Sequence, residues 1–138
     1  MPKVNPMSDI NVTTTCEEGY TAESIVGDWD LVIDAAEGDG PSANQVLVAS
    51  YASCFLPAFR VAANKEGFDG VGTVEIESSA ELDDSDDLTS IAWELRVEAD
   101  LGDSVDDVVA RAEDICHVHS ALREGLHADI TVTDGVDL

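Results

Sequence analysis

The chain has 138 residues, of which 44% are apolar, enough for one domain with a hydrophobic core and too many for a disordered acidic tail. Its charge is extreme, because 30 Asp and Glu residues stand against 6 Lys and Arg, for a net charge of −24. Such a surface repels nucleic acid and anionic membranes, so we expect neither as a partner.

The acidic residues are spread along the whole chain, whereas a local acidic site would concentrate them. Dispersed carboxylates with almost no lysine are typical of a salt-rich cytoplasm, where counterions screen like-charge repulsion over about 3 Å at ~1 M salt. The sequence therefore predicts a halophilic protein that loses stability on desalting. The polar N-terminal residues do not resemble a signal peptide, and we expect a cytoplasmic protein with reduced thiols.

Two strands are predicted before residue 35, because apolar and polar residues alternate there with a period of two. A turn over residues 17–20 follows the first strand, and a Gly-rich loop over residues 37–40 follows the second. The apolar faces carry Ile10, Val12, Thr14 and Cys16 in the first strand and Trp29, Leu31 and Ile33 in the second. This pattern predicts that Cys16 is a packing residue.

A long helix is predicted next. Ser42 is a suitable N-cap, Gln45 completes a capping box, and Gly67 ends the helix. Residues 46–63 are apolar on almost every face, which predicts a helix buried on all sides. The longest uncharged apolar stretch runs from Val46 to Phe59 and is ended by Arg60. Its 14 residues are too few to span a bilayer comfortably, so we expect a core helix.

The second half alternates strands and helices. Acidic and apolar residues alternate in two strands joined by a polar loop, as in an antiparallel sheet covered on one side. The predicted elements are strands over residues 74–78 and 91–99, a helix over 105–116 capped by Ser104, a short helix ended by Gly125, and a strand over 128–133. The order β-β-α-β-β-α-α-β predicts a single α+β domain over residues 1–138.

Two cysteines lie on the predicted helices. Cys54 is in the long helix, where Pro57 one turn later predicts a kink, and Cys116 ends the apolar stripe of the second helix. Each is either a small buried packing residue or one member of a redox pair. Cys116 with His117 and His119 has zinc-ligand chemistry but lacks CxxC or HxxxH spacing, so we expect no metal and no other cofactor.

The segment GPSANQVLVASYASCF resembles the start of the central helix in the OsmC/Ohr family of thiol-dependent peroxidases. That family reads Gly-Pro-Ser-Pro-Asn-Glu-Leu-Leu-Leu-Ala-Ser-Leu-Ala-Ala-Cys or a close variant. The segment ICHVHSAL resembles its second cysteine motif, usually Cys-Pro-Val-Ser. The resemblance covers nearly the whole chain and identifies it as a member of this family.

The resemblance implies an intertwined homodimer, with antiparallel strands packed on a long buried central helix and two active sites at the interface. It implies that the Cys54 thiolate attacks a peroxide oxygen and becomes a sulfenic acid. Cys116 would condense with it to a disulfide, and an external dithiol would reduce the pair.

The chain departs from the family where the reactive thiolate is usually held by an Arg and a Glu. The Glu position, ten residues before Cys54, is Asn44, and residues 4–59 contain no Arg or Lys. Arg60 points about 240° round the helix from the cysteine, at ~3.6 residues per turn. Arg123 is the better geometric candidate for a nearby cation.

Three functions stay open on these residues. The first is a peroxidase that reduces organic hydroperoxides or hydrogen peroxide, and the apolar helix around Cys54 favours organic ones. The second is a non-catalytic dimer that binds a small apolar molecule and has inert cysteines. The third is a redox sensor whose reversible disulfide alters a partner surface.

Overall fold

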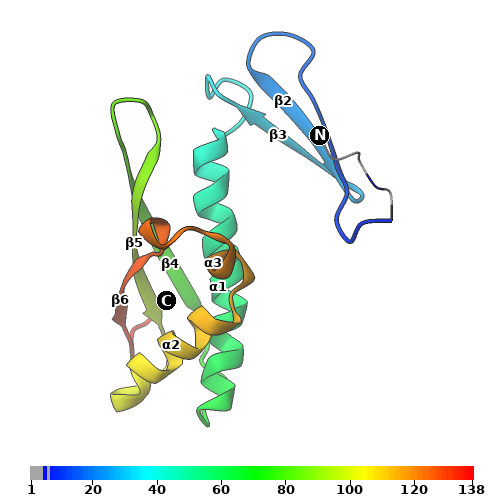
Figure 1. Cartoon of the computed structure of the whole chain (residues 1–138). Coiled ribbons are helices and arrows are strands. Elements are labelled where there is room, and N and C mark those ends of the chain that lie inside the picture. The colour runs from blue at the N-terminus through cyan, green and yellow to red at the C-terminus, as the bar shows by residue number, and fades with distance from the viewer. Residues whose placement is uncertain (1–4, 6) are drawn as a thin grey trace. The chain divides into compact units, whose positions relative to one another are not determined.

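The computed structural model describes residue 5 and residues 7–138, and the chain forms two compact units, residues 1–46 and 47–138. The first unit contains sheet A, an antiparallel sheet of β1 (Val12–Thr15), β2 (Thr21–Val26) and β3 (Trp29–Asp34) in that order (Figure 1). Sequence reasoning missed β2, because Ala and Ser hold its alternate positions in place of large apolar residues. A two-residue turn with Gly27 at φ 61° joins β2 to β3. The one-domain organisation stays a prediction.

Sheet A leaves large apolar side chains exposed. Trp29 is 72% exposed, and Val12, Ile25 and Leu31 are each about half exposed. Cys16 lies just beyond β1 and is also exposed, with its thiol directed at the Gly19 carbonyl at 3.5 Å. The prediction that Cys16 is a packing residue is therefore wrong for this chain, because no core forms on its side of the sheet.

Helix α1 (Ala43–Lys65) begins in the first unit and runs through the second. The predicted capping box is confirmed, since Gln45 N donates to Ser42 Oγ at 3.2 Å and Ser42 N donates to Gln45 Oε1 at 2.9 Å. Gly67 follows the helix at φ 97°, a conformation that L side chains avoid. The helix passes through Pro57 without interruption.

Sheet B forms the second unit with α1. It contains β4 (Val74–Leu82), β5 (Leu88–Val97) and β6 (Asp129–Thr133) in that order. β4 and β5 pair antiparallel as predicted, but β5 and β6 pair parallel, which corrects the expectation of an all-antiparallel sheet. The helices between β5 and β6 provide the crossover that a parallel pair requires.

The core lies between sheet B and one face of α1. Trp93 is 2% exposed, and its ring lies 4.3 Å from Tyr51 and 5.0 Å from Phe55, centroid to centroid. Buried residues alternate along β5 and recur along α1: Ile91, Trp93, Leu95 and Val97 on the strand, and Tyr51, Phe55, Ala58, Phe59, Ala62 and Ala63 on the helix. These side chains cover one side of α1.

The opposite side of α1 is exposed, including Ala49, Ser53, Pro57 and Val61. The prediction of a helix buried on every face is therefore wrong for the single chain, because sheet B contacts only one stripe. By length and composition α1 is the one helix of the described residues able to cross a membrane. The core helix of a soluble protein meets the same criteria of length and composition, and α1 packs one face against sheet B as such a helix does.

Short helices complete the second unit: a 3₁₀ turn (Gly102–Ser104), α2 (Val105–Ile115), α3 (His117–Ala121) and a second 3₁₀ turn (Glu124–Leu126). Ser104 holds the predicted N-cap position but makes no side-chain cap hydrogen bond, since the preceding 3₁₀ turn leaves it in a helical conformation. The helix predicted to continue to Gly125 ends at Ala121, and α2 is tied to the end of α1 by Arg111 and Glu66 at 2.9 Å.

Candidate functional site

Cys54 and Cys116 meet in the second unit. Cys54 is half-buried near the middle of α1, and Cys116 is fully buried between α2 and α3, as the C-cap of one and the N-cap of the other. Both thiols are free, and they lie close enough for each to shift the pKa of the other. Two cysteines that are 62 positions apart in sequence are thus neighbours in space.

The surroundings of Cys54 favour its thiolate. Burial raises its pKa, but hydrogen bonds from the Val118 backbone N–H, the Cys116 thiol and the His117 backbone N–H outweigh it, so the pKa is lowered. The donors are the first amides of α3, which have no partner within the helix. Sequence reasoning missed them, because a backbone N–H has no residue signature and only the fold brings α3 to α1.

The pKa of Cys116 is shifted in the opposite direction, upward. Burial and the hydrogen bond with Cys54 raise its pKa, while the His119 backbone N–H, 3.5 Å from the Cys116 sulfur, opposes the rise. As pH rises, Cys54 therefore loses its proton before Cys116 does. This is the order of ionisation that a nucleophile and a resolving thiol need.

The arginines of the chain all bind elsewhere, which corrects the expectation for Arg123. Its guanidinium donates to the Leu88 carbonyl at 2.9 Å, and that of Arg60 donates to the Gly72 carbonyl at 2.6 Å. Arg96 pairs with Glu75, and Arg111 pairs with Glu66. Among the described residues, backbone amides and a thiol thus take the place of a cation beside Cys54.

The two histidines that follow Cys116 are arranged differently from each other. His117 is exposed, whereas His119 is half-buried with its Nδ1 2.6 Å from the Tyr51 hydroxyl. Within the part of the chain that the structure describes, no group of three or more His, Cys, Asp or Glu side chains is arranged to hold a metal ion. Tyr51 is a further residue of this region that sequence reasoning missed, since an aromatic residue in an apolar helix has the appearance of core.

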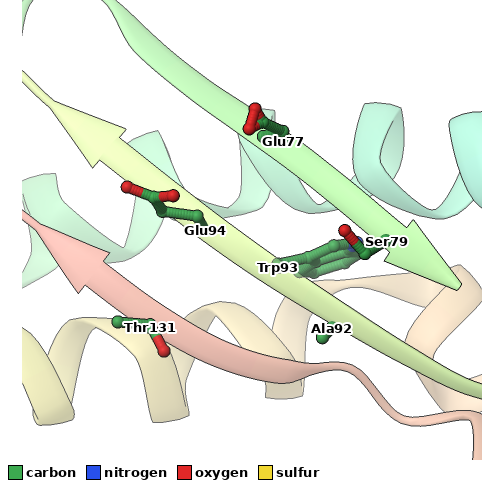
Figure 2. Close-up of a pocket in the computed structure, with 6 residues that line it drawn as sticks. All are labelled: Glu77, Ser79, Ala92, Trp93, Glu94 and Thr131. Atoms are coloured by element: carbon green, nitrogen blue, oxygen red, sulfur yellow. The ribbon is translucent and has the colours of Figure 1, made fainter.

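A separate hollow of about 290 Å³ lies on sheet B (Figure 2). Its lining residues are Glu77, Ser79, Ala92, Trp93, Glu94 and Thr131. Most of them belong to the exposed face of the strands, opposite the side chains that pack on α1. It is a shallow depression with two carboxylates at its rim and contains neither cysteine, so we do not assign the thiol chemistry to it.

A family model covers the part of the chain that contains the thiol pair. Residues 36–131, which include both cysteines, match the family model described as OsmC-like protein. The chain belongs to the OsmC-like family.

Individual relatives extend this assignment. An uncharacterized protein of Haloferax volcanii is 55% identical over 127 residues, covering 91% of this chain and 96% of the relative. An organic hydroperoxide resistance protein of Xanthomonas axonopodis is 29% identical over 103 residues, covering 73% of this chain and 71% of the relative. The crystal structure of an OsmC-like protein from Mycoplasma pneumoniae superimposes with a TM-score of 0.80 at 14% identity, covering 93% of this chain and 98% of that one. The OsmC-like α+β fold is therefore confirmed.

Proposed function

We propose that the protein is a two-cysteine thiol peroxidase that reduces organic hydroperoxides or hydrogen peroxide. The observation that carries the proposal is that the fold brings Cys54 and Cys116 together, where the Val118 and His117 backbone N–H groups and the Cys116 thiol lower the pKa of Cys54 against the effect of burial. The relation to an organic hydroperoxide resistance protein supports the same chemistry. The apolar side chains of α1 around Cys54 favour organic substrates.

In the proposed reaction the Cys54 thiolate attacks the outer peroxide oxygen, the O–O bond breaks, and the leaving alkoxide takes a proton to become an alcohol. Cys54 is then a sulfenic acid. Cys116 attacks its sulfur, the S–O bond breaks, and water and a disulfide form. An external dithiol reduces the disulfide by thiol exchange and is itself oxidised.

We also propose that the protein works as a homodimer in a salt-rich cytoplasm. The exposed apolar side chains of sheet A and the exposed stripe of α1 support a protein interface. The three free cysteines agree with a reducing compartment. Among the described residues Asp34 is the one buried charged side chain, so the other carboxylates lie at least partly at the surface, where hydrated counterions gather.

The test is a stoichiometric titration with an organic hydroperoxide in concentrated salt, with Cys16→Ser as the matched control. We expect wild type and control to form the Cys54–Cys116 disulfide, and Cys54→Ser to consume no peroxide. Cys116→Ser should accumulate a Cys54 sulfenic acid that dimedone traps. Oxidation of Cys54 no faster than that of an ordinary exposed thiol would sink the peroxidase proposal, and a disulfide without turnover would favour a sensor.

A further inference from the structure

A buried polar network lies beside Cys116. The Tyr51 hydroxyl and His119 Nδ1 are 2.6 Å apart, and the Ala128 backbone N–H donates to the Tyr51 hydroxyl at 3.1 Å. Because the hydroxyl already accepts from Ala128, its own hydrogen is available to Nδ1. The arrangement fits a neutral His119 with its proton on Nε2.

This network reaches Cys116 by two routes. The His119 backbone N–H donates to the Cys116 sulfur, which fixes the imidazole relative to the thiol. The charge of a Cys116 thiolate raises the pKa of Tyr51, after the larger effect of burial, so the hydroxyl lies within electrostatic reach of the sulfur. Tyr51 therefore contacts His119 and lies within electrostatic reach of the Cys116 sulfur.

The groups around His119 keep it neutral but ready to accept a proton. Burial and the stacked ring of His127, 3.8 Å away, lower its pKa, and these effects outweigh the opposing charges of Glu113 and Asp114. Glu113 Oε2 lies 3.8 Å from Nε2, where it would stabilise an imidazolium once formed. His127 is held by its own contact between Nε2 and the Leu122 carbonyl at 3.1 Å.

The thiol pair needs such an acceptor. While Cys54 is a thiolate, it accepts the Cys116 hydrogen bond, but oxidation of Cys54 removes that negative charge. The buried Cys116 then has a raised pKa and must still lose its proton to attack. A neutral base connected to the thiol removes this barrier.

We propose that Tyr51 passes the Cys116 proton to His119 Nδ1 when Cys116 attacks the Cys54 sulfur. The S–S bond forms, the bond from Cys54 to its leaving group breaks, and the leaving group departs with the electron pair. The imidazolium then protonates that group, which is hydroxide in the peroxidase cycle. This inference rests on the proposed function for its biological setting, but the proton transfer applies to any leaving group on Cys54. His119 acts through Tyr51 and is a positioning residue for the resolving thiol.

The experiment uses dipyridyl disulfide, which needs no peroxidase activity, in a Cys16→Ser background that removes the exposed thiol. The first release of pyridinethione reports attack by Cys54, and the second reports displacement by Cys116. The variants are His119→Asn, which keeps an acceptor near the Nδ1 position but does not titrate, Tyr51→Phe, and the two combined. Tyr20→Phe, an exposed tyrosine of the first unit, is the matched control.

We expect His119→Asn and Tyr51→Phe to leave the first release unchanged and to slow the second on the order of 100-fold at neutral pH. The double variant should lose no more than either single one, because the two residues act in series. In the wild type the rate of the second release should rise with pH and level off above the His119 pKa, which lies below the ordinary value of about 6.5. In His119→Asn this rate should keep rising with pH until Cys116 ionises unaided, at a pKa above the ordinary value of about 8.5.

Equal second-release rates and pH profiles in all variants would overturn the proposal. Equal slowing of both releases would also overturn it, because it would mean that the substitution displaces α3 from Cys54. A parallel run with an organic hydroperoxide separates the two proposals. If Cys54 does not oxidise there, the peroxidase proposal fails, while the proton path is still decided by the second pyridinethione.

Discussion

Sheet A and sheet B are both three-stranded and carry similar apolar residues, but only one of them has a core. In sheet B, Trp93 and Leu95 are at most 2% exposed beneath α1. In sheet A, Trp29 is 72% exposed and Leu31 is 45% exposed. Burial of apolar side chains thus stabilises sheet B within one chain, whereas the apolar face of sheet A is exposed.

This difference locates the surface on which the proposed homodimer would assemble. A large exposed aromatic on a strand indicates an interaction surface, since monomers seldom expose contiguous apolar patches. The candidate active site belongs entirely to the unit with the core. We therefore expect changes in sheet B to act on folding and changes in sheet A to act on assembly, and the following predictions test that division.

Desalting should have the largest effect, because it acts on the whole molecule. On transfer to dilute buffer the screening length rises from about 3 Å at ~1 M salt to about 30 Å at ~0.01 M. The carboxylates that give the chain its net charge of −24 then repel one another. We expect the thermal midpoint to fall steeply and the amides of sheet A to lose exchange protection before those of sheet B. Equal stability in dilute buffer and in molar salt would contradict the salt-adaptation prediction.

Leu95→Ala should destabilise the fold by about 2–5 kcal/mol, since it empties space in a closed core. Denaturant unfolding in concentrated salt measures the loss. Leu82→Ala is the matched control, because Leu82 is about half exposed at the end of β4 and its truncation should change stability by less than about 0.5 kcal/mol. A similar cost at both positions would mean that the core of sheet B is wrongly placed.

Trp29→Ser should weaken the proposed homodimer by about 2 kcal/mol, the size expected of an aromatic anchor at an interface. Sedimentation in concentrated salt measures the dissociation constant. Asp30→Asn, on the opposite face of β3, should leave it within about 0.5 kcal/mol. A wild-type protein that is monomeric at every concentration would remove the explanation offered for sheet A.

Alkylation should separate the two cysteines without disturbing the fold. The pKa of Cys54 is lowered by hydrogen bonds despite its burial, so its thiolate persists to lower pH, while burial raises the pKa of Cys116. Iodoacetamide should therefore label Cys54 first as pH rises, by about tenfold for each unit between the two pKa values. Mass spectrometry of both peptides checks the order, and preferential labelling of Cys116 would reverse the assigned roles.

Much of the fold was predictable because its signals are local. The Ser42–Gln45 capping box and the alternation around Trp93 each lie within a few residues, and both are confirmed. The parallel pairing of β5 with β6 was missed, since no local pattern reports which strand a segment pairs with. The exposed side of α1 was missed because composition shows what a helix can bury and not what packs on it.

The candidate site, like the fold, was predictable from sequence only where its signals are local. The sequence was sufficient to place Cys54 on the long helix and Cys116 at the end of the next, and their motifs were sufficient to indicate the family. The sequence left the activation of Cys54 open, because no Arg or Glu stands at the positions where the family usually has them. Folding instead brings the Val118 and His117 amides of α3 to the thiol. Only the tertiary structure decides this, since every residue carries an N–H and its position in space alone makes it a ligand for a thiolate.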